Sequence, residues 1–202
     1  MKKSMPWIRC AGFLVGLAVI LGICDFCFAP SGYVRFILHE VNRKDTQYDT
    51  IILGASHARS AINPEYLDEE LGTNTLNLAI PGETVKDAYY LLKDACESND
   101  VKTVIMDVDY QYWMDEQPQG YFTEPFICQN ITNLKVKTEY LLDNWDTIDL
   151  RNVLVRRLSW DCTWSSVKQN VSTKMTEAYR EYSIEAAGVD GKVEGADGPY
   201  IG

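Results

Sequence analysis

The sequence predicts an α/β domain built on a parallel sheet and preceded by one transmembrane helix. Near the N-terminus, a long apolar segment follows basic residues, which is the pattern of a membrane-spanning helix. Beyond that segment, short β-branched runs alternate with helical apolar patterns in the order strand, helix, strand, helix, strand. Right-handed crossovers convert this order into a parallel sheet covered by helices.

Composition indicates a globular chain and excludes one class of partner. With 46% hydrophobic and 24% charged residues, the chain can form a folded core, and its 202 residues leave room for one ordinary domain beside the anchor. The formal net charge is -10, so the chain lacks the clustered Lys/Arg surface that binds phosphate backbones. Nucleic acid is therefore not expected as a partner.

The anchor is predicted within residues 1–30. Lys2, Lys3 and Arg9 precede or begin the apolar run from Trp7 to Phe28, which meets the length of about 20 residues that a helix needs to cross a bilayer. The basic end stays in the cytoplasm, so we expect a single-pass membrane protein with an extracytoplasmic domain.

A cleaved signal peptide ending at Cys27-Phe28-Ala29 is the alternative. Pro30 directly after that cleavage position and the length of the apolar run both favour an uncleaved anchor. Both interpretations export the rest of the chain.

Residues 31–47 are predicted to be a juxtamembrane connector, residues 48–187 the α/β domain, and residues 188–202 a flexible tail. The stretch from Tyr33 to Val41 is amphipathic, which predicts a helix lying near the membrane. The tail is rich in glycine and aspartate and has almost no large apolar residues.

The first predicted strand covers residues 48–54, a β-branched run that ends in glycine. Asn63 followed by Pro64 is typical of a helix N-cap with proline at the first helical position. Gly72 is expected to end that helix.

The second predicted strand covers residues 75–80 and is followed by a turn at Pro81-Gly82. Thr84 and Asp87 have the spacing of a capping box, which predicts a helix that ends near Ser98-Asn99.

Residues 101–108 are predicted to form a third, buried strand. Further helices are expected at residues 137–145 and 150–158, where they could cap the sheet.

The cysteines outside the anchor do not predict a metal site. Cys96, Cys128 and Cys162 form no C-x-x-C pair, so no zinc site is expected. No cofactor is expected either. One disulfide among these three residues and buried free thiols are both open interpretations.

Three loops at the carboxyl ends of the strands are the candidate site: residues 54–59, 80–84 and 107–113. In an open parallel sheet, ligands bind outside these strand ends. The first loop places Ser56 on a tight turn before a helix, which is the geometry of a nucleophilic serine. The alternative is that the Gly-x-Ser turn only caps the helix or binds phosphate.

Residues 51–64, with the sequence IILGASHARSAINP, resemble the first block of the SGNH/GDSL hydrolase superfamily. They are most similar to its membrane-anchored branch, which includes alginate O-acetyltransferase and D-alanyl-lipoteichoic acid transfer proteins. Residues 77–82 resemble the second block of that branch, and residues 102–109 resemble its third strand.

The resemblance implies a flavodoxin-like three-layer fold. It also implies that Ser56 is the nucleophile and that the N–H groups of Ser56 and Gly82 are oxyanion donors. The asparagine of the family's third block has no counterpart here. Asp107, Asp109 and Tyr110 occupy that region instead, with Asp109 and Tyr110 as candidate substrate contacts. For these two residues, a solvated strand end and loop packing are the alternative interpretations.

The sequence departs from the family at the general base. The superfamily's Asp-x-x-His motif is missing, and the only histidines are His39 and His57. A serine needs a base within hydrogen-bond reach. His39 is expected beside the membrane. His57 adjoins Ser56, but neighbouring side chains on a tight turn usually diverge, which favours a role in packing or in orienting the loop.

The resemblance thus predicts a serine esterase or O-acyltransferase domain that acts on cell-envelope polysaccharide or teichoic acid. Without the Asp-x-x-His motif, the domain would be inactive or part of a longer protein. A non-catalytic protein that binds glycan, or that assists a membrane-bound acyltransferase, is the alternative. The expected partners are a cell-envelope glycan or acylated polymer, a membrane acyltransferase, and the membrane itself.

Overall fold

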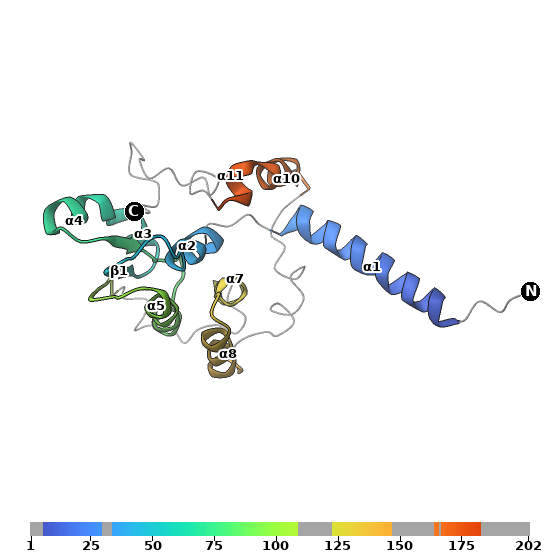
Figure 1. Cartoon of the computed structure of the whole chain (residues 1–202), viewed down its shortest axis with the longest axis horizontal. Coiled ribbons are helices and arrows are strands. Elements are labelled where there is room, and N and C mark those ends of the chain that lie inside the picture. Colours follow the sequence, from blue (N-terminus) through green and yellow to red (C-terminus); the bar gives the residue numbers. More distant parts are fainter. Residues whose placement is uncertain (1–5, 30–33, 109–122, 147–163, 166, 183–202) are drawn as a thin grey trace, which may run out of the picture.

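The computed structural model describes residues 6–29, 34–108, 123–146, 164–165 and 167–182 (Figure 1). This part of the chain is a mixed α/β structure. It contains a small parallel sheet of three strands, is otherwise mostly helical, and begins with one long apolar helix.

Helix α1, Pro6–Phe28, extends away from the rest of the molecule (Figure 1). Its apolar run of 22 residues, Trp7–Phe28, is long enough to cross a membrane, and none of its most apolar window is buried. A core helix of a soluble domain would be mostly buried, so the exposure favours a helix that faces lipid or a signal sequence.

The sheet consists of β1 (Thr50–Leu53), β2 (Thr75–Asn77) and β3 (Thr103–Met106) in the order β2-β1-β3. All the pairs are parallel, and Ile51 is level with Leu76 on one side and with Val104 on the other. Every residue of β1 is buried, as expected for a central strand covered on both faces. The predicted parallel sheet is therefore confirmed, with shorter strands.

The burial predicted for the third strand is wrong. Val104 is 43% exposed and Met106 is 38% exposed. The strand lies at an edge of the sheet and pairs with β1 on one side within the described residues. On β3, Ile105 packs against the small cluster of Ile52, Ala58 and Ala79.

The helix predicted to begin after Asn63 has the predicted boundaries. Helix α4, Pro64–Leu71, begins after Asn63, whose Oδ1 accepts a hydrogen bond from the Glu65 N–H at 3.0 Å. It ends at Gly72, which has the left-handed φ of +68°. A short helix, α3 (Ser56–Ala61), precedes it and was not predicted as a separate element.

Helix α5, Val85–Ser98, begins with the predicted capping box. The Thr84 hydroxyl accepts from the Asp87 N–H, and the Asp87 carboxylate accepts from the Thr84 N–H. The pair satisfies two N–H groups that have no acceptor within the helix.

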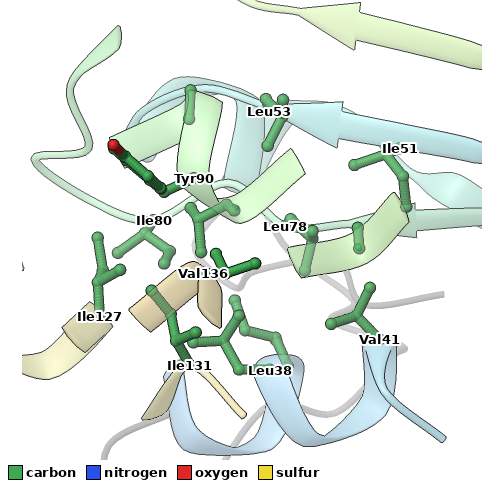
Figure 2. Packing of buried hydrophobic residues seen from close by; sticks show 14 of the residues in the cluster. Leu38, Val41, Ile51, Leu53, Leu78, Ile80, Tyr90, Ile127, Ile131 and Val136 are labelled. Carbon is green, nitrogen blue, oxygen red and sulfur yellow. The ribbon is translucent and has the colours of Figure 1, made fainter. Parts of the chain in front are cut away.

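Helix α2, Val34–Val41, forms where the amphipathic pattern predicted it, but the structure places it in the core. Figure 2 shows Leu38 and Val41 pointing from α2 toward Ile51 and Leu78 of the sheet layer. Leu38 and Val41 are fully buried. The apolar face of α2 is therefore covered by the domain, and a boundary at residue 48 leaves a core element outside it.

The remaining helices cover the sheet or lie beside the anchor. Helix α7 (Thr123–Asn130) packs against α2, and α8 (Leu134–Asp143) packs against α5. Helix α8 begins three residues before the predicted start at residue 137. Helices α10 (Val167–Met175) and α11 (Glu177–Arg180) were not predicted. The helix expected at 150–158 and the tail expected at 188–202 lie outside the described residues.

Candidate functional site

The three candidate loops begin side by side at one edge of the sheet. The Ile80 N–H donates to the Gly54 carbonyl at 3.0 Å, which joins the ends of β1 and β2. On the other side, the Asp107 N–H donates to the Leu53 carbonyl at 2.9 Å. The start of each loop is thus positioned by backbone bonds to the end of the central strand, as predicted for parallel strands.

Gly54 is required by close packing at this edge. Its φ is +148°, a value that residues with a Cβ rarely adopt. A Cβ on Gly54 would lie 2.8 Å from the Ala58 Cβ and 2.9 Å from the Asp107 Cβ. The glycine therefore allows α3 and the end of β3 to pack closely around the end of β1.

Ser56 is the first residue of α3, and both Ser56 and His57 are exposed. Ala55 and Ala58 are buried on the inner side of the same turn. Because the first N–H groups of a helix have no acceptor within it, the Ser56 N–H can donate to a ligand. The structure thus presents a serine hydroxyl to solvent at the edge where the three loops begin.

Gly82 lies in the tight turn that follows β2. The Glu83 N–H donates to the Ile80 carbonyl at 2.8 Å, and Gly82, with a φ of +76°, follows Pro81. This is the pattern of a type II turn, with proline second and glycine third. The turn starts at Ile80, which is bonded to Gly54, so the backbone at Gly82 is fixed relative to the first loop.

Glu83 is a buried acid in this turn that the sequence did not single out. Its side chain is 3% exposed, and its Oε2 accepts from the Ile80 N–H at 2.9 Å. Its Oε1 is buried without a hydrogen bond of normal geometry in the described part of the chain. Burial, reinforced by the nearby charge of Asp87, raises the pKa of Glu83 well above its usual range. The neutral, protonated carboxyl is thus favoured where the first two loops meet.

Asn77 is a second residue that sequence reasoning missed. Its side-chain N–H groups donate to the carbonyls of Ala58 at 3.1 Å and Ile62 at 3.3 Å, and its Oδ1 accepts from the Ala79 N–H at 3.1 Å. The amide therefore ties β2 to α3, the helix that carries Ser56. The available signal was a polar residue in a buried strand, where an amide without partners would be costly.

The structure does not bring both histidines to Ser56. His39 lies on α2, where its ring stacks on Tyr182 with a centroid distance of 3.8 Å. Burial lowers the pKa of His39, and the neighbouring Glu40 carboxylate opposes this shift only in part. His57 is next to Ser56 in the chain and exposed. Of the two histidines, His57 is the one that lies in a candidate loop, residues 54–59.

The other predicted residues are only partly described. Asp107 is half-buried against Gly54, whereas Asp109 and Tyr110 lie outside the described residues. Cys96 is an exposed free thiol and Cys128 is a buried one. Cys162 also lies outside the described part of the chain.

The topology singles out the first loop within this edge. The chain leaves β1 for β2 on one side and then crosses to β3 on the other, so the strand order reverses between β1 and β3. In open α/β sheets, ligands bind at such a switch point. The residues at this switch point are Gly54, Ser56 and Asp107.

In comparisons with protein-family models, with curated proteins and with solved structures, the chain has no match.

Proposed function

We propose that the chain is an SGNH-like serine esterase or O-acyltransferase domain with a flavodoxin-like fold, acting on cell-envelope polysaccharide or teichoic acid. The observation that carries the proposal is the exposed Ser56 at the switch point between β1 and β3. The Gly82 turn, held to the end of β1 through Ile80, supports the same assignment.

In this function, the Ser56 Oγ attacks the carbonyl carbon of an acyl ester and passes its proton to a base. The N–H groups of Ser56 and Gly82 donate to the oxyanion that forms on the carbonyl oxygen. The alcohol leaves with a proton, and the acyl group stays on Ser56. Water or a polymer hydroxyl then attacks the acyl-enzyme, which releases the acid or the acylated polymer and restores Ser56.

The base in this scheme is either His57 or another group, on this chain or on a partner protein. His57 is exposed beside Ser56, which would let a bound substrate or partner reorient it. Fluorophosphonate labelling of His57→Ala separates the two options. Loss of labelling assigns the proton transfer to His57, and unchanged labelling assigns it to another group.

The polymer is assigned to the cell envelope because the domain is proposed to lie outside the membrane. The basic residues Lys2, Lys3 and Arg9 would keep the N-terminus in the cytoplasm, and α1 would cross the bilayer once. Ser56 would then face the compartment that holds envelope glycans and teichoic acids.

Labelling by a fluorophosphonate probe tests the proposal on the full chain in membranes. The wild-type chain should be labelled covalently, and Ser56→Ala should lose essentially all labelling. Ser60→Ala, in the same helix, is the matched control and should be labelled like the wild type. An unlabelled wild-type chain, or equal labelling of Ser56→Ala, would contradict the proposal.

A second candidate is a non-catalytic protein that binds glycan or assists a membrane acyltransferase. The observation that favours it is the shortage of a general base for Ser56. The ring of His39 is stacked on Tyr182, and the sequence has no Asp-x-x-His motif, so His57 is the one histidine in the three loops. This function predicts that Ser56→Ala keeps its envelope partner in a crosslinking experiment. Loss of that partner on the single substitution would count against it.

A further inference from the structure

Helix α10 binds the end of the proposed membrane anchor through two buried polar side chains. The Lys174 ammonium donates to the Phe26 carbonyl at 2.7 Å and also to the Ala29 carbonyl. The Asn170 amide donates to the carbonyls of Cys27 at 2.8 Å and Ala29 at 3.0 Å. The last carbonyls of a helix have no N–H partner within it, so these side chains supply the missing donors. A lysine there also carries the charge that suits the negative end of a helix dipole.

The length of α1 fixes the level of this contact in a bilayer. A rise of about 1.5 Å per residue makes the apolar run Trp7–Phe28 roughly 33 Å long, which matches a hydrocarbon core of about 30 Å. The last turn of α1 therefore reaches the headgroup layer on the outer side. Lys174 and Asn170 are hydrogen-bonded to that turn, so α10 must lie at the same level.

Large apolar side chains are exposed beside this contact. Trp164 is 84% exposed, and its ring meets the Phe28 ring edge to face with centroids 4.8 Å apart. Met175, next to Lys174, is 60% exposed. An exposed tryptophan against the last residue of a spanning helix is the arrangement of an interfacial aromatic anchor.

The same segment is connected to the core of the domain. Helix α11 carries Tyr179, whose hydroxyl accepts from the Arg35 guanidinium at 2.6 Å. The Arg35 guanidinium also lies 4.5 Å from the centre of the Tyr179 ring. Phe36, the next residue on α2, is 1% exposed and contacts the Tyr179 ring edge to face. A continuous series of contacts thus runs from α1 through α10 and α11 to α2.

We propose that Trp164 and α10 form a membrane platform, which binds the headgroup layer of a lipid bilayer and holds the domain at a set height above it. Trp164 and Met175 lie in the lipid interface, and Lys174 clamps the end of α1. The platform rests on the proposed membrane anchor but not on catalysis by Ser56. If Ser56 proved not to be catalytic, the proposed platform would be unaffected.

Hydroxyl-radical footprinting of the full chain in phospholipid nanodiscs tests the platform. A Tyr66→Trp substitution is introduced into the chain to provide a reference indole. Tyr66 is 63% exposed and lies on α4, at the end of the molecule opposite to α1 (Figure 1). Exposure to water alone predicts faster oxidation of Trp164 than of the reference indole. The platform predicts the reverse order, with Trp164 oxidised at least about threefold more slowly because lipid covers it. Oxidation of Trp164 at an equal or higher rate would overturn the proposal.

A pair of variants tests the clamp in the same assay. Lys174→Met removes the donors but keeps an apolar stem, and should raise the oxidation of Trp164 at least about twofold. Lys168→Met, at an exposed position of the same helix, is the control and should leave it unchanged. If Trp164 stays protected in Lys174→Met, the clamp is refuted. Release of the wild-type chain by carbonate washing would refute the anchor and the platform together.

Discussion

Replacing Gly54 by alanine should destabilise the domain by about 2 to 6 kcal/mol, and the structure shows where this cost arises. At a φ of +148°, a residue with a Cβ is strained by about 1–3 kcal/mol. The new Cβ would also lie 2.8 Å from the Ala58 Cβ and 2.9 Å from the Asp107 Cβ. Neither atom is the end of a flexible side chain, so the backbone must move, and such overpacking costs about 1–3 kcal/mol.

Gly72→Ala is the matched control for this experiment. Gly72 also has a positive φ, +68°, but within the described part of the chain no atom outside Gly72 and its two chain neighbours lies within 4 Å of the position that its Cβ would take. It should lose only about 1–2 kcal/mol, from backbone strain. Urea unfolding of both variants of the full chain in detergent, followed by circular dichroism, measures the two free energies. If they agree within about 0.5 kcal/mol, the packing argument for Gly54 is wrong.

Two further predictions concern the residues that hold the loops. Because burial raises the pKa of folded Glu83, the stability that depends on its proton is full below the usual carboxyl pKa and is lost as the pH rises through the raised value. The free energy of unfolding of the wild type minus that of Glu83→Gln should therefore fall with rising pH in a series of urea titrations, and a flat difference would contradict the burial argument. Asn77→Ala should cost about 1–3 kcal/mol in the same assay, since the Ile62 carbonyl loses the Asn77 donor and the Ala58 carbonyl keeps only the Ile62 N–H. The control is Asn74→Ala, which removes one exposed side-chain hydrogen bond to the Gln47 carbonyl, and equal costs would show that burial of the Asn77 bonds adds no stability.

Local elements could be predicted because their signals are chemical and lie within a few residues. Asn63 and Thr84 cap helices through side chains that reach N–H groups two or three residues away. Gly72 ends a helix because glycine tolerates the left-handed conformation. The order of strands and helices then predicted a parallel sheet, and backbone bonds place its three loops at one edge.

Long-range packing could not be predicted in the same way. The amphipathic pattern of α2 predicted a helix with one apolar face, but a membrane surface and a protein core satisfy such a face equally well. Similarly, the apolar run of β3 was consistent with a buried strand, although the strand lies at an edge of the sheet that the described residues form.

For the site, the sequence by itself determined that Ser56 follows a glycine at a strand end and that Gly82 lies in the next loop. Only the tertiary structure decided that Gly54 must be a glycine because Ala58 and Asp107 close around it. It also decided that Asn77 ties β2 to α3 and that the Glu83 carboxyl is buried in the turn at Ile80. The physical reason is range: capping and turns depend on neighbouring residues, whereas burial and polar partnership depend on which distant segments the fold brings into contact.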